Sequence, residues 1–371
     1  MELFRGDILQ SNKNITGVFA ALLFFAAIYR FPARAGEVRA SFMILMDFAV
    51  ALALVTVLWQ YTNKYVALFL IAATLSSFYP AYGPYSFQSW HMVFVGLTWY
   101  LIIVHFSDRD SIGLYLDVMC AIAIYNLLAQ VIQYEKILWL LKNQENVIVG
   151  FMANPNEASA LYVFCLPAFL RKGWVKYIPL VFLGIYLSSS AMGYMCVVVG
   201  SLAIVYWARL EFLKTGEFQK SALMFGLTGS GIAVILYYLM FAPVESLTLR
   251  VQVWIATFKV LKQHWITGCG IGHWKTLFTA PMPFDGKRWM TAHNEFYQLW
   301  AEMGIVPLII LAGYFINIFK RYIDAARLSV LALILISVNS FGNFPFHIAP
   351  LALIAVTWFG IMEIQLKGVT T

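Results

Sequence analysis

The chain has 371 residues, of which 61% are hydrophobic and only 12% are charged. Soluble domains carry about twice that charged fraction, so the composition excludes a soluble domain. The net charge is +7, and the basic residues are spread along the chain. They do not form a basic face interleaved with aromatic residues, so we expect no nucleic-acid partner. We therefore predict a single polytopic membrane domain over residues 1–371, built only from α-helices, which satisfy their own backbone hydrogen bonds.

Twelve apolar segments follow one another along the chain, and each is a candidate transmembrane helix. The segments lie at about 15–30, 41–59, 65–79, 89–106, 111–133, 157–170, 174–189, 191–210, 220–242, 293–319, 328–342 and 347–365. Lys and Arg concentrate in connections on one side of this arrangement, and the positive-inside rule then places both termini in the cytoplasm. The outer side carries two long loops, 134–156 and 243–292, the second of which separates the ninth and tenth helices.

The connection after the first apolar segment breaks the positive-inside rule, because Arg30, Arg34 and Arg39 would lie outside. Three explanations stay open. Residues 33–35, Ala-Arg-Ala, could end a cleaved signal peptide. Otherwise the first span is not cleaved, or the outward arginines bind an anionic lipid head group.

The outer loop 134–156 has apolar residues at helical spacing, which indicates a helix that lies flat on the membrane surface. These residues are Tyr134, Ile137, Leu138 and Leu141. The loop ends in a turn that we expect to cap the sixth helix, Asn154-Pro155-Asn156-Glu157. A corner of small residues at 188–193 opens the eighth helix and favours close helix packing.

The larger outer loop, 243–292, contains an amphipathic pattern, and we expect a helix that lies against the membrane or against the helix bundle. Its apolar stripe consists of Leu247, Val251, Trp254, Phe258 and Leu261. Arg250 lies at the edge of the stripe, where its guanidinium either binds an interfacial phosphate or stays solvated among lipid head groups. Three alternating glycines, Gly268, Gly270 and Gly272, then predict a sharp backbone turn.

The tenth apolar segment begins at His293, directly after that loop. The helix dipole disfavours a protonated imidazole in the first turn, so His293 is either a general base or an interfacial histidine solvated by water. Tyr297 falls on the same helical face as His293, whereas Glu302 falls on roughly the opposite face. Glu302 would lie at a depth where an ionised carboxylate is costly, so it must face protein or a water-filled cavity, and we expect it to secure the helix.

The last outer turn, Phe341-Gly342-Asn343-Phe344-Pro345-Phe346-His347, either closes over this site or anchors the chain at the membrane interface. No two histidines have the i, i+4 spacing of a metal site, and no acidic cluster accompanies them. The four cysteines also lack metal-ligand spacing. We expect no metal, no disulfide and no cofactor.

The order and spacing of these motifs resemble the O-antigen ligase and O-antigen polymerase superfamily of bacterial envelope glycosyltransferases. The superfamily also includes certain protein O-oligosaccharyltransferases. The ligase-type pattern of a histidine, ten residues and a glycine matches His293 and Gly304, with Glu302 two residues before the glycine. The family's Arg-then-Trp helix matches Arg250 and Trp254. The glycine turn 268–272 and the asparagine turn 154–156 complete a resemblance that covers roughly 150–365.

One position departs from the family pattern. Members commonly carry a Ser-Arg pair at the outer corner where this chain has Ser190-Ala191. The resemblance therefore implies that Arg34 or Arg288 replaces the absent phosphate-binding arginine, or that the activity is weakened or altered.

The resemblance implies a metal-independent enzyme in the bacterial inner membrane, with a periplasmic active site and with 243–292 as a periplasmic loop. It would transfer a preassembled glycan from undecaprenyl diphosphate to an acceptor hydroxyl of lipid A-core. Polymerase onto a growing glycan and protein O-oligosaccharyltransferase are the near alternatives, and a transporter of lipid-linked sugars is an alternative of another class. The implied residues are His293 as catalytic base, Arg250, Arg288 and Arg34 for the diphosphate, and Glu302, Asn156 and Tyr297 as supporting residues.

Overall fold

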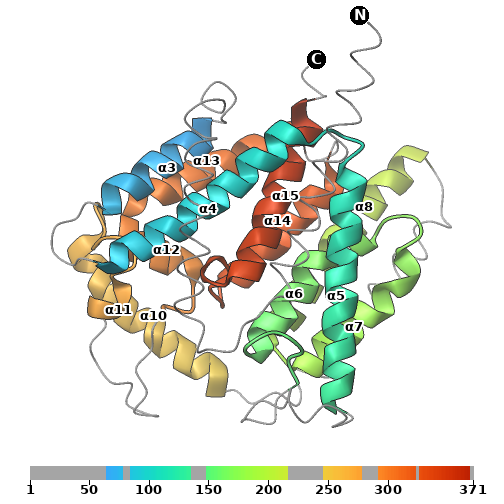
Figure 1. The fold of residues 1–371 in the computed structure, drawn as a ribbon, viewed down its shortest axis with the longest axis horizontal. Coiled ribbons are helices and arrows are strands. Elements are labelled where there is room, and N and C mark those ends of the chain that lie inside the picture. Colours follow the sequence, from blue (N-terminus) through green and yellow to red (C-terminus); the bar gives the residue numbers. More distant parts are fainter. Residues whose placement is uncertain are drawn as a thin grey trace, which may run out of the picture.

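A computed structural model describes residues 64–77, 84–134, 148–215, 245–277, 291–322 and 326–367. Every regular element in these ranges is a helix, which confirms the all-α class for this part of the chain (Figure 1). The elements are α3 (Lys64–Ser77), α4 (Pro84–Phe106), α5 (Ile112–Tyr134), α6 (Pro155–Phe169), η4 (Val175–Tyr177), α7 (Ile178–Ser188), α8 (Ala191–Thr215), α10 (Glu245–His264), α11 (Trp274–Leu277), α12 (Glu295–Met303), α13 (Ile305–Tyr322), α14 (Arg327–Ser340), η5 (Pro345–His347) and α15 (Ala349–Lys367). The expected spans 15–30, 41–59 and 220–242 lie outside the described residues, as does most of the expected surface helix of loop 134–156.

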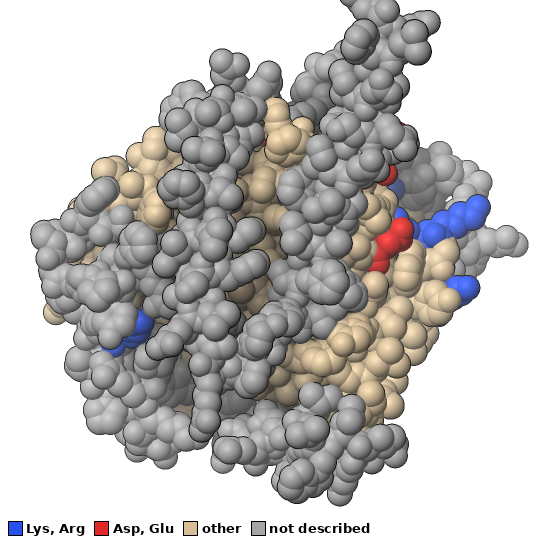
Figure 2. Space-filling view, in the orientation of Figure 1, with Lys and Arg blue, Asp and Glu red and all other residues tan. Residues whose placement is uncertain are grey.

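Three of these helices are long and apolar enough to cross a membrane, over Ile112–Tyr134, Ala191–Arg209 and Ala349–Leu366. Five shorter apolar helices accompany them within the described residues. Large apolar side chains are also exposed, for example Leu75 at 68% and Ile309 at 63%. Figure 2 shows that the visible described surface is mainly uncharged, with charged side chains gathered chiefly at one edge. These features indicate a membrane protein, while the count of twelve spans and the cytoplasmic termini stay predictions.

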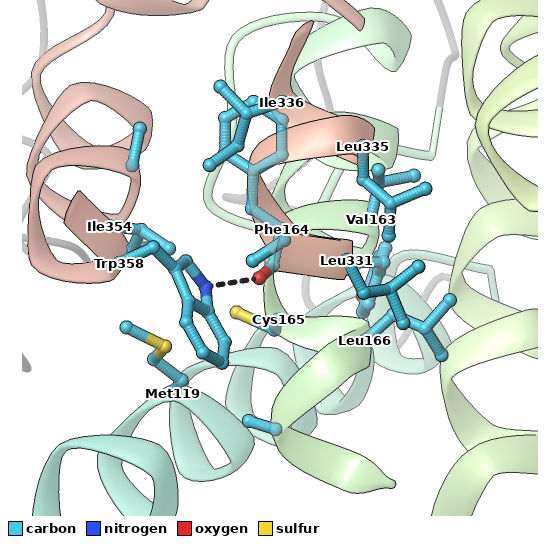
Figure 3. Close-up of a cluster of buried hydrophobic side chains, with 14 of the residues drawn as sticks. Met119, Val163, Phe164, Cys165, Leu166, Leu331, Leu335, Ile336, Ile354 and Trp358 are labelled. Carbon is cyan, nitrogen blue, oxygen red and sulfur yellow. Dashed lines mark hydrogen bonds between the residues drawn. The ribbon is translucent and has the colours of Figure 1, made fainter. Parts of the chain in front are cut away.

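Helix α6 is the centre of the main core, because it packs against α5, α7, α8, α14 and α15. Every side chain from Ala158 to Phe169 is buried. Figure 3 shows Met119 of α5 and Trp358 of α15 on one side of Phe164 and Cys165 of α6. The Trp358 indole donates a 2.8 Å hydrogen bond to the Phe164 carbonyl, so this fully buried side chain also satisfies its polar atom.

A second group of helices stands beside this core. α4 packs along α15, and α3 packs against α4 and α13 (Figure 1). α12 contacts α3, α13, α10 and α11, and α10 lies along its outer side at the lower left of Figure 1. The short helix α12 therefore connects the outer elements to the bundle.

The expectation of one continuous helix over 293–319 is wrong, because α12 ends at Met303 and α13 begins at Ile305. The break occurs at Gly304, whose backbone has φ 77° and ψ −170°. This is a region of backbone space that essentially only glycine adopts. A Cβ at this position would lie 1.9 Å from the Ile266 carbonyl oxygen, so the close approach of a distant segment requires the glycine.

The glycine turn 268–272 is the segment that fits into this break. The amide of Cys269 donates to the Ala301 carbonyl at 2.8 Å, and the amide of Gly270 donates to the Glu302 carbonyl at 2.9 Å. The last carbonyls of α12 are thus satisfied by the turn rather than by further helical residues. A Cβ on Gly268 would lie 2.2 Å from the Glu302 carbonyl oxygen, so both glycines are needed for this interlock.

The buried face of α10 also differs from the apolar stripe expected from the sequence. Val253, Thr257 and Leu261 are buried, whereas Val251 and Phe258 of the expected stripe are 40% and 48% exposed. The buried residues pack with Trp274 and with Ala292 and Ala301, at and beside α12. Contact with α12 therefore determines which face of α10 is buried, and the opposite face keeps exposed apolar side chains.

Candidate active site

His293 is held immediately before α12 in a left-handed backbone conformation, with φ 47°. Such a conformation is uncommon for a residue with a side chain and persists only where surrounding contacts impose it. Trp254 of α10 donates from its indole to the His293 carbonyl at 3.4 Å, and the ring of Phe344 lies edge-on at 4.8 Å from the imidazole. Asn294 caps α12 by accepting a hydrogen bond from the Tyr297 amide at 3.0 Å. The local sequence and two distant aromatic residues together fix the position of His293.

A small cavity of about 20 Å³ opens beside this imidazole. Its polar lining comes from His293, from the start of α6 and from the last outer turn. The side chains concerned are His293, Asn154, Asn156, Glu157 and Asn343. A cavity of this size admits roughly one water-sized group, so one hydroxyl oxygen could lie next to the imidazole.

The start of α6 forms the opposite wall and confirms the capping turn expected from the sequence. Asn154 accepts from the Glu157 amide at 3.0 Å, and the Glu157 carboxylate accepts from the Ala153 amide at 3.0 Å. These bonds resemble a capping box, although the carboxylate binds the amide one residue before the cap, and Pro155 lies in the first turn. Asn156 accepts a 2.8 Å hydrogen bond from the Ser190 hydroxyl, which joins it to the corner where Ala191 begins α8.

The electrostatics of the site favour a neutral imidazole. Burial lowers the pKa of His293, and the nearby positive charge of Arg250 lowers it further, to about 3. Arg250 is itself only 6% exposed, on the face of α10 that turns toward α12. His293 is therefore uncharged at neutral pH and keeps a lone pair available to accept a proton.

Glu302 lies on the other side of α12, where it binds the glycine turn. Its carboxylate accepts from the amide of Gly272 at 2.9 Å and from the amide of Trp274 at 3.3 Å. The side chain of Gln298 donates to it at 3.3 Å. Burial raises the pKa of Glu302, although the charge of His347 and these hydrogen bonds oppose the rise.

Glu302 also lines a second, larger cavity of about 540 Å³, which is mostly apolar. The cavity lies between α3, α4 and α12 to α15, and its polar end includes Glu295, Gln298 and His347. His347 forms an ion pair with Glu295, with 3.1 Å between Nδ1 and Oε1. Desolvation disfavours the charged imidazole, but the carboxylates of Glu295 and Glu302 outweigh it and raise the pKa of His347 to about 9.

The structure brings only part of the predicted site together. His293 and Asn156 line the same small cavity, and Arg250 acts on His293 through its charge. Tyr297 lines neither cavity and instead packs edge-on against Trp254, with 6.3 Å between ring centroids. Arg34 and Arg288 lie outside the described residues.

Sequence reasoning missed a polar face on α5 that holds the segment before Asn154. Gln133 accepts from the amides of Val149 and Gly150 at 2.9 and 2.8 Å, and Asn126 accepts from the Phe151 amide at 2.8 Å. A signal was present, since Asn126, Gln130 and Gln133 share one helical face within an otherwise apolar segment. Glu295 and His347 were missed for another reason, because nothing in the local sequence of either residue indicates the other.

Comparison with known proteins agrees with the family resemblance of the sequence. Residues 177–312 match the family model described as O-antigen ligase, a range that includes Arg250, His293 and Gly304. No curated protein matches the chain. The matched family acts in glycosyl transfer with lipid-linked glycans and acceptors in general. This match supports membership in the O-antigen ligase superfamily, the family that the motifs of the sequence resemble.

Proposed function

We propose that the chain is a ligase that transfers a preassembled glycan from undecaprenyl diphosphate to a hydroxyl of lipid A-core, at the periplasmic face of the inner membrane. The observation that carries the proposal is the position of His293 beside a cavity of hydroxyl size, where burial and the charge of Arg250 favour a neutral imidazole. The family match supports the class of reaction. Polymerase and protein O-oligosaccharyltransferase activities use the same chemistry and differ in the acceptor.

In this reaction His293 takes the proton of the acceptor hydroxyl, and the hydroxyl oxygen attacks the anomeric carbon of the glycan. A new carbon–oxygen bond forms while the bond from the anomeric carbon to the phosphate oxygen breaks. The electron pair leaves with the lipid diphosphate, whose negative charge requires cations. Arg250 supplies one such cation, and Arg288 and Arg34 are proposed to supply the others.

Arg250 also links donor binding to the basicity of His293. In the free site its positive charge helps to lower the pKa of the imidazole to about 3. A bound diphosphate would offset that charge, and the pKa of His293 would rise toward the value that suits a base at neutral pH. The base would then become effective when the donor is in place.

The three supporting residues are proposed to position this site. Glu302 holds the glycine turn on α12 through the amides of Gly272 and Trp274. Tyr297 packs against Trp254, which binds the backbone of His293. Asn156 lines the cavity and is fixed by Ser190.

The experiment is complementation of a strain that lacks the chain, with the lipopolysaccharide ladder as the readout. Uncapped core with accumulated lipid-linked polymer in the deletion strain supports ligase, while core capped by a single repeat supports polymerase. Wild type and His264→Ala, a change of a histidine at the end of α10 outside both cavities, should restore the ladder. His293→Ala should be expressed and fail to restore it, and a full ladder from that variant would refute the role of His293.

Transport of lipid-linked sugars is the candidate from another class. Movement of the lipid-linked glycan across proteoliposomes without transfer to an acceptor would favour it. The family match argues for glycosyl transfer instead.

A further inference from the structure

The last outer turn, residues 341–347, separates the two cavities and contributes to both. Asn343, Phe344 and Pro345 line the small cavity with His293, whereas Phe346 and His347 line the large one. The turn is short and internally bonded, since the amide of His347 donates to the Phe344 carbonyl at 3.1 Å. Whatever fixes His347 therefore also fixes Phe344, whose ring lies against the His293 imidazole.

Glu295 is the residue that fixes His347. It lies in the first turn of α12, two residues after His293, and pairs with His347 Nδ1 at 3.1 Å. The Glu295 side chain is 14% exposed, and its second oxygen is buried without a hydrogen-bond partner among the described residues. A carboxylate in such surroundings strongly favours a donor that carries positive charge.

Gln298 lies between His347 and the backbone that precedes His293. Its side-chain oxygen accepts from the Ala292 amide at 3.0 Å, and its side-chain nitrogen lies 3.2 Å from His347 Nε2. Glu295 thus holds His347 through Nδ1, while Gln298 of the same helix lies against the other side of the ring. A third contact joins α12 to the turn 341–347, because the ring centroids of Phe296 and Phe341 lie 4.7 Å apart.

We propose that the Glu295–His347 pair is a positioning element of the active site, which holds the turn 341–347 on the start of α12 and keeps Phe344 against His293. Phe344 then closes the small cavity and fixes the orientation of the imidazole. Neither Glu295 nor His347 lines the cavity that contains His293, so both act through the turn. This role rests on the proposed function of His293 as the base.

The protonation of His347 gives this pair a pH dependence. The charged groups that face it are Glu295 and Glu302 of α12 and Lys275 of α11, and the carboxylates dominate. Because the folded-state pKa of His347 is raised above the usual value of about 6.5, its contribution to stability is complete below that pH. The contribution is lost as pH rises from about 6.5 through about 9.

The test combines His347→Ala, His347→Asn and Glu295→Gln in glycan transfer by purified protein in proteoliposomes. His347→Ala should lower kcat by about 10- to 100-fold, because a displacement of about 1 Å at a base costs this much. The KM for the lipid-linked donor should change less than threefold. His347→Asn keeps a donor near the position of Nδ1 and should recover most of the lost rate.

Two further readouts separate positioning from general loss of structure. Because Glu295 and His347 act as one unit, the double variant Glu295→Gln/His347→Ala should lose no more rate than His347→Ala alone. Wild type should lose rate and apparent Tm between pH 6.5 and 9, and His347→Asn should not show that fall. Wild-type kcat in His347→Ala, additive losses in the double variant, or the same alkaline fall in His347→Asn would each overturn the proposal.

Failure of this proposal can be told from failure of the proposed function. If His293→Ala transfers glycan at the wild-type rate, the function of His293 is wrong, whatever the other variants show. The coupling of Glu295 to His347 in thermal unfolding, and its loss at alkaline pH, can still be measured in that case. If His293→Ala is inactive while Glu295→Gln and His347→Ala act as wild type, only the positioning role is wrong.

Discussion

Replacement of Gly304 by alanine tests the interlock that presents His293 at the start of α12. The new Cβ would lie 1.9 Å from the Ile266 carbonyl oxygen, so the segment before the glycine turn must move away. The substitution also forces alanine into a backbone region that costs about 1–3 kcal/mol. Movement of the turn breaks the bonds from Cys269 and Gly270 to α12, at about 1 kcal/mol each. We expect a total loss of about 3–5 kcal/mol from these effects.

The assay is thermal unfolding in detergent, together with glycan transfer. A loss of this size should lower the apparent Tm by roughly 4–6 °C and should reduce transfer, since the glycine turn is anchored to the helix that follows His293. Gly173→Ala is the matched control, because Gly173 also has a positive φ, 94°, but a Cβ there meets no atom within 4 Å. If Gly304→Ala unfolds at the same temperature as Gly173→Ala, the interlock does not stabilise the protein and the reasoning is refuted.

Two further predictions concern the arginines. Arg250→Gln should lower kcat/KM by about 100-fold through the loss of one diphosphate contact. It should also move the acidic limb of the pH–rate profile to higher pH, because a positive charge that lowers the pKa of His293 is removed; an unmoved limb would contradict the coupling. If Arg288 replaces the arginine that is absent at Ala191, Arg288→Ala should lose transfer and Ala191→Arg/Arg288→Ala should regain part of it. No recovery in the double variant would argue against that replacement.

The sequence predicts the helices well where apolar runs are long and their ends carry clear signals. The expected segment 111–133 is α5, Ile112–Tyr134, and the expected segment 347–365 is α15, Ala349–Lys367. The cap at Asn154 follows from local chemistry alone, because Asn, Pro and Glu at those positions favour the start of a helix wherever it lies. Local patterns of this kind need no knowledge of the rest of the fold.

The features that failed depend on contacts between distant segments. Gly304 lies within an apolar run and looks like a tolerated glycine, and only the approach of Ile266 shows why the helix ends there. The phase of α10 is set by α12, which allows a charged residue, Arg250, on the buried face. Gln298 and His347 meet across 49 residues of sequence, a distance over which helical periodicity carries no information.

The candidate site was predicted in part for the same reason. The motif around His293 identifies the residue. Its neutral state, however, comes from burial and from the charge of Arg250, and the sequence alone does not show that contact. The cavity shared with Asn156 results from packing of α6 against the last outer turn. Residue types and spacing thus indicate the class of chemistry, and tertiary contacts decide which groups meet.

The central claim is that His293 is the base in glycan transfer. The most direct measurement is the pH dependence of transfer by purified wild type and His293→Ala in proteoliposomes that contain the undecaprenyl-diphosphate glycan and lipid A-core, with His264→Ala as the control. We expect His293→Ala to lose at least 100-fold in kcat at neutral pH and to recover partially as pH rises, because hydroxide can replace the missing base. His264→Ala should act as wild type. Transfer by His293→Ala at the wild-type rate across the pH range would contradict the claim.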